Sequence, residues 1–182
     1  MRWIGRFRQI AVACTSLAGC RQMAASGIAA QQCRVIPPPV GVIANGQLSR
    51  QQLGLRDEDR VLLAVGESTH ASRHRLAIWT AVILHFLDRR YRLLLWGRGP
   101  QAEQAHRFAA ALKQPDLCVF AEQRAGHPVH WSDVANLADL AIFTAVCASA
   151  ILPGAICQLL NIPVVDAGGT GSIGAEFTNC GR

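Results

Sequence analysis

The sequence predicts an α/β fold built on a parallel sheet, and three observations support this prediction. Short, nearly continuous apolar runs such as 60–65 and 92–96 are typical of parallel strands that are buried on both faces. Apolar and amphipathic stretches of helical length separate these runs. Gly66 and Gly97 directly follow two of the runs, where the chain must turn towards the next helix. The alternation predicts a Rossmann-like, doubly wound sheet with its ligands beyond the carboxyl ends of the strands.

Length and composition indicate one full-sized packed domain, since 51% of the 182 residues are apolar and 16% are charged. The formal net charge of +6 favours anionic partners such as nucleotides and phosphates. The arginines are spread along the chain without interleaved aromatic residues, so we do not expect a nucleic-acid partner. No run approaches about 20 apolar residues, so we expect no transmembrane segment.

The cysteines and histidines show no metal-site spacing. The seven cysteines contain no Cys-x-x-Cys pair, which favours reduced thiols that pack as small apolar side chains in a cytoplasmic protein. The pairs His70/His74 and His127/His130 have no acidic or cysteine partner at ligand spacing. We therefore expect neither a metal nor another cofactor.

The amino terminus allows two interpretations. Arginines at 2, 6 and 8, an apolar run and the sequence Leu17-Ala-Gly-Cys20 resemble an export signal with a lipoprotein cleavage box. Alternatively, a strand within 9–16, a helix over 17–25 and a strand over 33–36 form the start of a folded unit. We prefer the second interpretation because it also accounts for residues beyond Cys20, and the lipoprotein remains a lesser alternative.

The prolines at 37–39 divide the chain into residues 1–46 and 47–182, because three successive prolines continue neither a helix nor a central strand. Helix 76–87 is apolar on nearly every face, so we expect it to be covered on most sides, with Trp79 and Trp96 in the core. The other expected elements are a short helix at 47–53, strands at 60–65, 92–96, 117–120, 139–143 and 162–165, and helices at 101–112 and 149–160, with a segment 131–137 of unassigned type.

Five motifs, in this order, resemble the donor-binding half of a family 4 glycosyltransferase of the GT-B type. They are Asn45-Gly46, Val61-Leu-Leu-Ala-Val-Gly66, Leu93-Leu-Leu-Trp-Gly-Arg-Gly-Pro100, Ala138-Asp-Leu-Ala141 and Asn161-Ile-Pro-Val-Val165. The resemblance implies that residues 1–46 are a short strand-helix-strand remnant of the acceptor domain with a linker. Residues 47–182 would be a nucleotide-sugar-binding domain that is incomplete at its carboxyl end, so the chain resembles a truncated and degenerate relative.

The resemblance also implies where a donor would bind. It places the donor phosphates near Gly66, the nucleotide pocket at Gly97-Arg-Gly99 and the base beside Ala121 and Glu122. For each of these segments an ordinary turn or solvated loop remains the alternative. The implied donor-binding residues are Gly66, Glu67, Ser68, Thr69, Arg73, Gly97, Arg98, Gly99, Ala121, Glu122 and Ser149.

The chain departs from the family pattern at charged positions. The family's arginine and lysine after the first glycine are replaced by Glu67 and Ser72, and its paired glutamates by Ser149 and Ile156. A carboxylate repels a diphosphate, and each lost charged hydrogen bond is worth about 1.5–3 kcal/mol.

Two functional hypotheses follow. One is transfer of a sugar from a nucleotide diphosphate sugar to an unknown acceptor, with a separate acceptor-domain partner and no identified catalytic residue. The other is a non-catalytic nucleotide-binding or interaction module.

Overall fold

The computed structural model describes residues 11–15, 17–36, 48–145 and 151–167. Its main feature is a five-stranded sheet with the order β5-β4-β3-β6-β7, in which every neighbouring pair is parallel. The strands are β3 (Arg60–Val65), β4 (Tyr91–Trp96), β5 (Cys118–Phe120), β6 (Leu140–Phe143) and β7 (Val164–Asp166). The larger helices are α2 (His74–Leu87), α3 (Ala102–Ala111) and α6 (Ile151–Leu159), and the short ones are α4 (Ala121–Ala125), α5 (Trp131–Ala135) and η3 (Gln51–Leu53).

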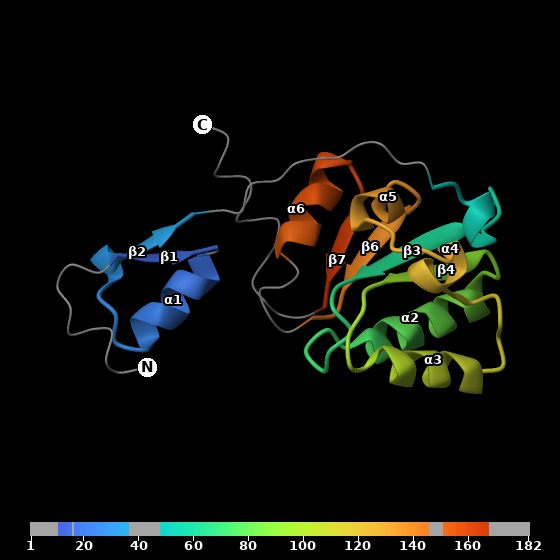
Figure 1. Ribbon diagram of the computed structural model, residues 1–182, viewed down its shortest axis with the longest axis horizontal. Helices are drawn as coiled ribbons and strands as arrows, with labels where there is room; N and C mark the ends of the chain where they lie inside the picture. Colours follow the sequence, from blue (N-terminus) through green and yellow to red (C-terminus); the bar gives the residue numbers. More distant parts are fainter. Residues whose placement is uncertain (1–10, 16, 37–47, 146–150, 168–182) are drawn as a thin grey trace.

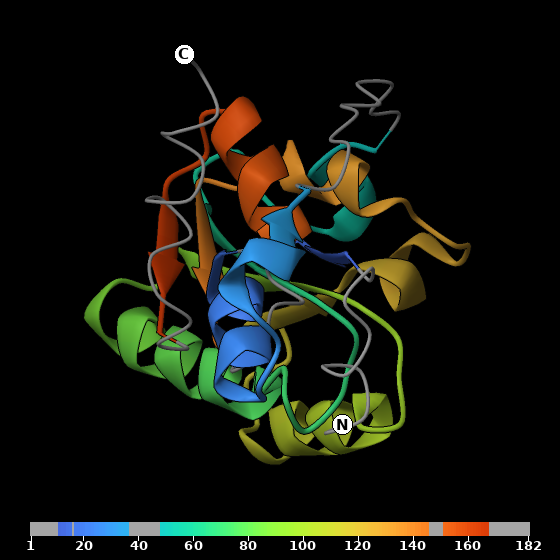
Figure 2. The same cartoon turned by 90° about the vertical axis from the view of Figure 1, so that its left-hand side faces the viewer.

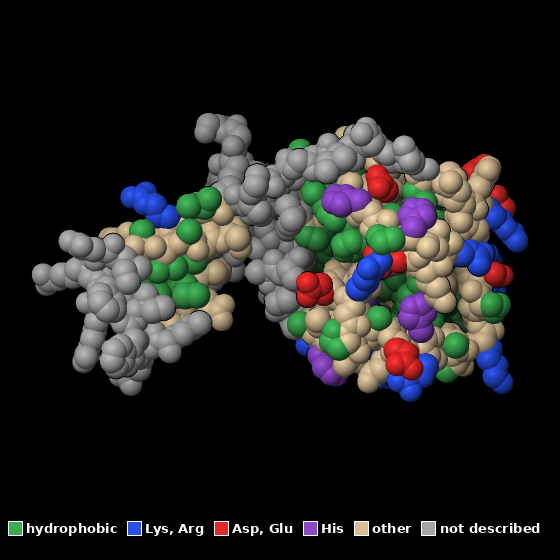
Figure 3. Space-filling model, viewed as in Figure 1, with side chains coloured by type: hydrophobic (Ala, Val, Ile, Leu, Met, Phe, Trp, Pro, Cys, Tyr) green, Lys and Arg blue, Asp and Glu red, His purple; other side chains and the backbone are tan. Residues whose placement is uncertain are grey.

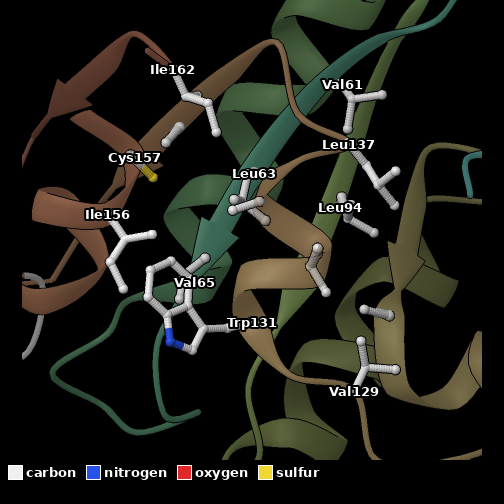
Figure 4. Close-up of a cluster of buried hydrophobic side chains, with 14 of the residues drawn as sticks. Val61, Leu63, Val65, Leu94, Val129, Trp131, Leu137, Ile156, Cys157 and Ile162 are labelled. Atoms are coloured by element: carbon white, nitrogen blue, oxygen red, sulfur yellow. The ribbon is translucent and has the colours of Figure 1, made fainter. Parts of the chain in front are cut away.

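Helices cover both faces of this sheet, as the alternation of apolar runs predicts (Figure 1). On one face, α2 and α3 lie side by side and pack on Leu62, Leu93 and Leu95. On the other face, Val61, Leu63 and their neighbours pack with side chains from α5 and α6 (Figure 4). Successive strand residues therefore serve two separate apolar clusters, which confirms a doubly wound sheet.

The chain changes direction across the sheet between β3 and β6. These strands pair only through Leu62 with Leu140 and Leu63 with Ala141, whereas β3 pairs with β4 from Arg60 to Val65. The loop after β3 leads to α2 on one face, and the chain after β6 leads to α6 on the other (Figure 1). This is a topological switch point, the place where open α/β sheets leave a crevice for a ligand.

A second, small unit precedes the five-stranded sheet in the chain. Strand β1 (Val12–Cys14) pairs in parallel with β2 (Cys33–Val35), and α1 (Leu17–Ala25) packs against both strands (Figure 2). A 3-10 turn, η2 (Ala30–Gln32), leads into β2. The predicted strand-helix-strand order is confirmed, and Leu17-Ala-Gly-Cys20 forms the start of α1. The origin of this unit as part of an acceptor domain remains a prediction.

The prediction that α2 is covered on most sides is wrong. Trp79, expected in the core, is 48% exposed, whereas Trp96 is partly buried and donates from Nε1 to the Val129 carbonyl at 2.7 Å. Among the described elements, α2 packs on β3, β4 and α3, and several of its large apolar side chains remain exposed. The large exposed apolar side chains of α2 are Leu76, Trp79, Ile83, Phe86 and Leu87, and we call this set the α2 stripe.

Two further findings concern predicted segments. The segment 120–124, expected as a loop, contains the one-turn helix α4, which ends at Gly126 in a left-handed conformation with φ 73°. In the described part of the chain, no helix combines the length and the apolar character that a membrane span requires. The proline-rich segment 37–39 and Ser149 lie outside the described residues.

Candidate nucleotide-binding edge

Most of the predicted site residues lie at one edge of the five-stranded sheet. Gly66 follows β3, Gly97 follows β4 and Ala121 follows β5, so all three come directly after carboxyl ends of neighbouring strands. Parallel strands end at the same edge, and the structure therefore brings together segments that are about 55 residues apart in sequence.

At this edge the loops after β3 and β4 lie backbone against backbone. The Ser68 N–H donates to the Arg98 carbonyl at 2.7 Å, and the Gln101 N–H donates to the Ser68 carbonyl at 2.9 Å. A Cβ on Gly97 would clash with the Gly66 carbonyl, and a Cβ on Gly99 would lie 2.5 Å from the Ser68 carbonyl oxygen. Gly97 and Gly99 are thus required for the close approach of two loops, whether or not a ligand binds.

One pocket, which we call the β4–β5 pocket, opens between the loop after β4 and α4 and has a volume of about 450 Å³. Arg98 and Glu122 form an ion pair in it at 2.5 Å, from Nε to Oε2. Its wall includes a stacked pair of rings, His106 of α3 and Phe120 of β5, whose centroids are 3.6 Å apart. The predicted residues that line it are Gly97, Arg98, Gly99, Ala121 and Glu122.

A second pocket, which we call the α2–α3 pocket, lies between the amino-terminal ends of α2 and α3 and has a volume of about 480 Å³. Ser68, Thr69 and Arg73 from the predicted set line it. The structure thus divides eight of the predicted donor-binding residues between two pockets that share no lining residue, and Gly66 and Glu67 line neither pocket.

Two of the positions that depart from the family pattern, Ser72 and Ile156, have structural roles. The Ser72 hydroxyl donates to the Glu67 carbonyl and lies 3.1 Å from Thr69 Oγ1, so it holds the loop after β3 in place. At the switch point, Thr144 Oγ1 donates to the Ser72 carbonyl at 2.7 Å. Ile156 is buried in the apolar cluster that contains Trp131 and Val65, and it offers no polar group (Figure 4).

Sequence reasoning missed two histidines at this edge. His74, at the start of α2, is buried, and burial lowers the pKa of its imidazole. His106 is partly buried against Phe120, and burial lowers its pKa as well. His106 lies four residues after Ala102, which also lines the β4–β5 pocket, so both residues lie on the same side of α3.

Charged side chains of both signs are interspersed on the face of the molecule in Figure 3, with no extended basic patch. Among the described residues, no group of three His, Cys, Asp or Glu side chains is placed to hold a metal ion.

The chain is similar in fold to solved structures of glycosyltransferases. HepE from Anabaena, solved with UDP and glucose and with UDP-glucose, superposes with a TM-score of 0.70 at 19–20% identity over 89% of this chain. WaaG, a glycosyltransferase involved in lipopolysaccharide biosynthesis, gives 0.68 at 16% identity over 88% of this chain. A glycosyltransferase from Rickettsia africae gives 0.67 at 15% identity over 86%.

The chain covers only 44–45% of the length of these three proteins. No protein-family model and no curated protein sequence matches the chain. At these identities the likeness concerns the fold alone. The chain has the α/β fold of one half of a GT-B glycosyltransferase.

Proposed function

We propose that the chain binds a nucleoside diphosphate sugar at the carboxyl edge of its five-stranded sheet, as the donor-binding part of a glycosyltransferase. One observation carries the proposal: the five residues that the resemblance assigns to the nucleotide and its base line a single pocket. They come from two separate segments of the chain, the loop after β4 and the start of α4. The switch point between β3 and β6 lies at the same carboxyl edge of the sheet, on the side of Gly66.

The β4–β5 pocket has groups suited to a planar base. The stacked rings of His106 and Phe120 offer an aromatic wall, and stacking on such a wall contributes about 1–3 kcal/mol per base. Arg98 and Glu122 supply a donor and an acceptor for the polar edge of a heterocycle. This combination would orient the base, while the diphosphate and sugar extend towards Gly66 and Glu67.

The transfer reaction needs more than this edge supplies. Breaking the bond between the sugar and the diphosphate leaves negative charge that positive side chains or backbone N–H groups must stabilise. Glu67 follows Gly66, towards which the diphosphate would extend, and its carboxylate would repel that negative charge. We therefore assign no catalytic residue to the chain and propose that a separate acceptor domain completes the active site.

Calorimetric titration of the chain with uridine, guanosine and adenosine diphosphates and their sugar conjugates tests the binding proposal. We expect one base to bind with a Kd below about 100 μM. Ala102→Trp places a large side chain in the β4–β5 pocket and should abolish binding. Glu103→Trp, on the exposed side of the same helix, is the matched control. Absence of binding, or equal binding by both variants, would contradict the proposal.

A non-catalytic nucleotide-binding module is the second candidate, and the burial of Ile156 favours it. The resemblance expects a carboxylate at that position, but the side chain lies among apolar neighbours and is 3% exposed. A glutamate placed there would be buried without a partner, so this substitution tests folding rather than donor affinity. Turnover of a bound nucleotide sugar, measured with and without a separate acceptor domain, decides between the two candidates.

A further inference from the structure

Two cysteines of the small amino-terminal unit face the same helix from neighbouring strands. In β1, Ala13 is exposed and Cys14 is buried, and in β2, Cys33 is less exposed than Arg34. Cys33 pairs with Val12, which lies two residues before Cys14, so the Cys14 and Cys33 side chains point to one face of the strand pair. Helix α1 packs against both strands (Figure 1), and the two thiols therefore lie between the strands and α1.

A third thiol, that of Cys20, reaches this interface from α1. Cys20 and Met23, three residues later, are less exposed than the two residues between them, so this side of α1 faces the strands. Partial burial, a hydrogen bond with the Cys14 thiol and the nearness of Cys33 raise the pKa of the Cys20 thiol above its usual value. The alternation of exposure and the hydrogen bond agree that the three thiols are neighbours.

Strand geometry decides which of these thiols can be joined. Because Cys33 pairs with Val12 and Cys14 with Val35, Cys14 and Cys33 stand diagonally on the two strands. Strand spacing and rise per residue place their Cα atoms about 8 Å apart. A disulfide requires Cα atoms within about 7 Å of each other, so these two cysteines cannot be bridged without moving the backbone. Cys14 and Cys20, which share a hydrogen bond, are the pair that the structure favours.

The unit that holds these thiols has a very small apolar core. Each of its strands has three residues, and among its described residues the buried apolar side chains are Cys14 and Ile28. Folded units of this size gain much of their stability from cross-links, because they bury too little apolar surface. A covalent bond between α1 and β1 would therefore stabilise the unit substantially.

We propose that Cys14 and Cys20 form a disulfide by exchange with a small-molecule disulfide, and that this bond fastens α1 to β1. Cys20 is the more exposed of the two, so its thiolate attacks one sulfur of the small disulfide, forms a mixed disulfide and releases one small thiolate. The Cys14 thiolate then attacks the Cys20 sulfur and releases the second small thiolate. Two protein thiols are oxidised and one small disulfide is reduced, and the two protons of the protein thiols pass to the released thiolates.

The raised pKa of the Cys20 thiol sets the conditions for this exchange. The thiolate is the reacting form, so exchange is slow near neutral pH and becomes faster as the pH rises. The thiols then stay reduced in a reducing compartment and are joined only under sustained oxidation. The site involves neither pocket of the five-stranded sheet, so the inference does not depend on the proposed nucleotide binding.

Peptide mapping tests the proposal, because trypsin separates the candidate pairs. Cleavage after the arginines at 8, 21 and 34 releases peptide 9–21, which contains Cys14 and Cys20, and peptide 22–34, which contains Cys33. The full chain is incubated with oxidised glutathione at about pH 8, its remaining thiols are alkylated in urea, and the digest is analysed by mass spectrometry without reduction. We expect peptide 9–21 to lack two hydrogen atoms and to carry no alkyl group, and Cys33 to be alkylated.

Two cysteines of the five-stranded unit report whether the chain stays folded during oxidation. Burial raises the pKa of the Cys118 thiol to about 12 and that of the Cys157 thiol to about 11. Both thiols should therefore escape exchange in the folded chain and be recovered in the alkylated form.

Two variants and brief digestion of the folded chain measure what the bond does. Cys33→Ser should still form the disulfide within peptide 9–21, and Cys20→Ser should not. Arg21 is exposed in α1, so tryptic cleavage there reports local opening of the helix. Oxidation should slow this cleavage about tenfold in the unchanged chain and in Cys33→Ser, and leave Cys20→Ser unaffected. A link between the two peptides, glutathione adducts without an internal disulfide, unreacted thiols, or equal cleavage rates before and after oxidation overturns the proposal.

Discussion

At the scale of single residues, the carboxyl edge of the sheet depends on groups that have unusual surroundings. His74 is held in a buried position without a partner for Nε2, and Gly97 and Gly99 allow two backbones to touch. Both features are measurable, since a buried imidazole changes stability with pH and a glycine at a close approach does not tolerate a side chain.

We expect stability to fall with acidification because of His74. Burial lowers the pKa of this imidazole below the usual 6.5. The contribution is fully present above about pH 6.5 and is lost as the pH falls through the lower, folded-state pKa. The free energy of unfolding, measured with urea at several pH values between about 7.5 and 5, should fall less steeply with pH for His74→Gln than for the unchanged chain. His106 is present in both proteins, so the difference isolates His74, and equal slopes would contradict the expectation.

Alanine at Gly97 or Gly99 should destabilise the chain by roughly 2–4 kcal/mol, because the new Cβ meets backbone atoms of the loop after β3. Gly126→Ala is the control. Gly126 also has a positive φ, 73°, but a Cβ there meets nothing within 4 Å, so only the backbone strain of about 1 kcal/mol remains. The free energy of unfolding in urea measures both, and equal losses would show that the contact between the loops is unimportant.

At the scale of elements, the sequence predicts strands better than it predicts their surroundings. The expected strand at 60–65 coincides with β3, because a strand buried on both faces is apolar at nearly every position. The apolar pattern of α2 indicates a helix but not how many neighbours it has. The burial of Ser68 is likewise invisible in its own segment, since its backbone packs against the loop after β4.

The α2 stripe should promote self-association. Replacing Ile83 and Phe86 by glutamate is expected to change the free energy of unfolding by no more than about 0.5 kcal/mol each, because both side chains are exposed. Sedimentation velocity should then show less oligomer than for the unchanged chain. Ile78→Glu, on the buried side of the same helix, should instead unfold it. A monodisperse monomer before substitution would contradict the expectation.

At the scale of the whole molecule, the two halves of the sheet are joined along the short pairing of β3 with β6. Asp139 supports this seam: its Oδ2 accepts from the Val61 N–H at 2.7 Å, and its Oδ1 accepts from Arg50 at 2.9 Å. Arg50 also donates to the carbonyls of Leu137 and Asp59. These hydrogen bonds therefore link the segment before β3 to the starts of β3 and β6.

Asp139→Ala should lower the free energy of unfolding by about 1–3 kcal/mol, because the Val61 N–H and Arg50 lose their acceptor. Asp139→Asn keeps one oxygen and should cost less. Chemical denaturation measures both variants. Glu58→Ala is the matched control, since this carboxylate is exposed and lies 3.9 Å from Arg56. A loss no larger than that of the control would show that the seam does not depend on Asp139.

The backbone contact between the loops after β3 and β4 also has a kinetic consequence. Hydrogen bonds from Ser68 and Gln101 hold these loops together before any ligand arrives. A molecule entering at this edge would meet walls that are already in place and would spend little free energy on ordering them. Differences in affinity among related ligands should then arise mainly from how slowly each one leaves, with association rates that are nearly alike.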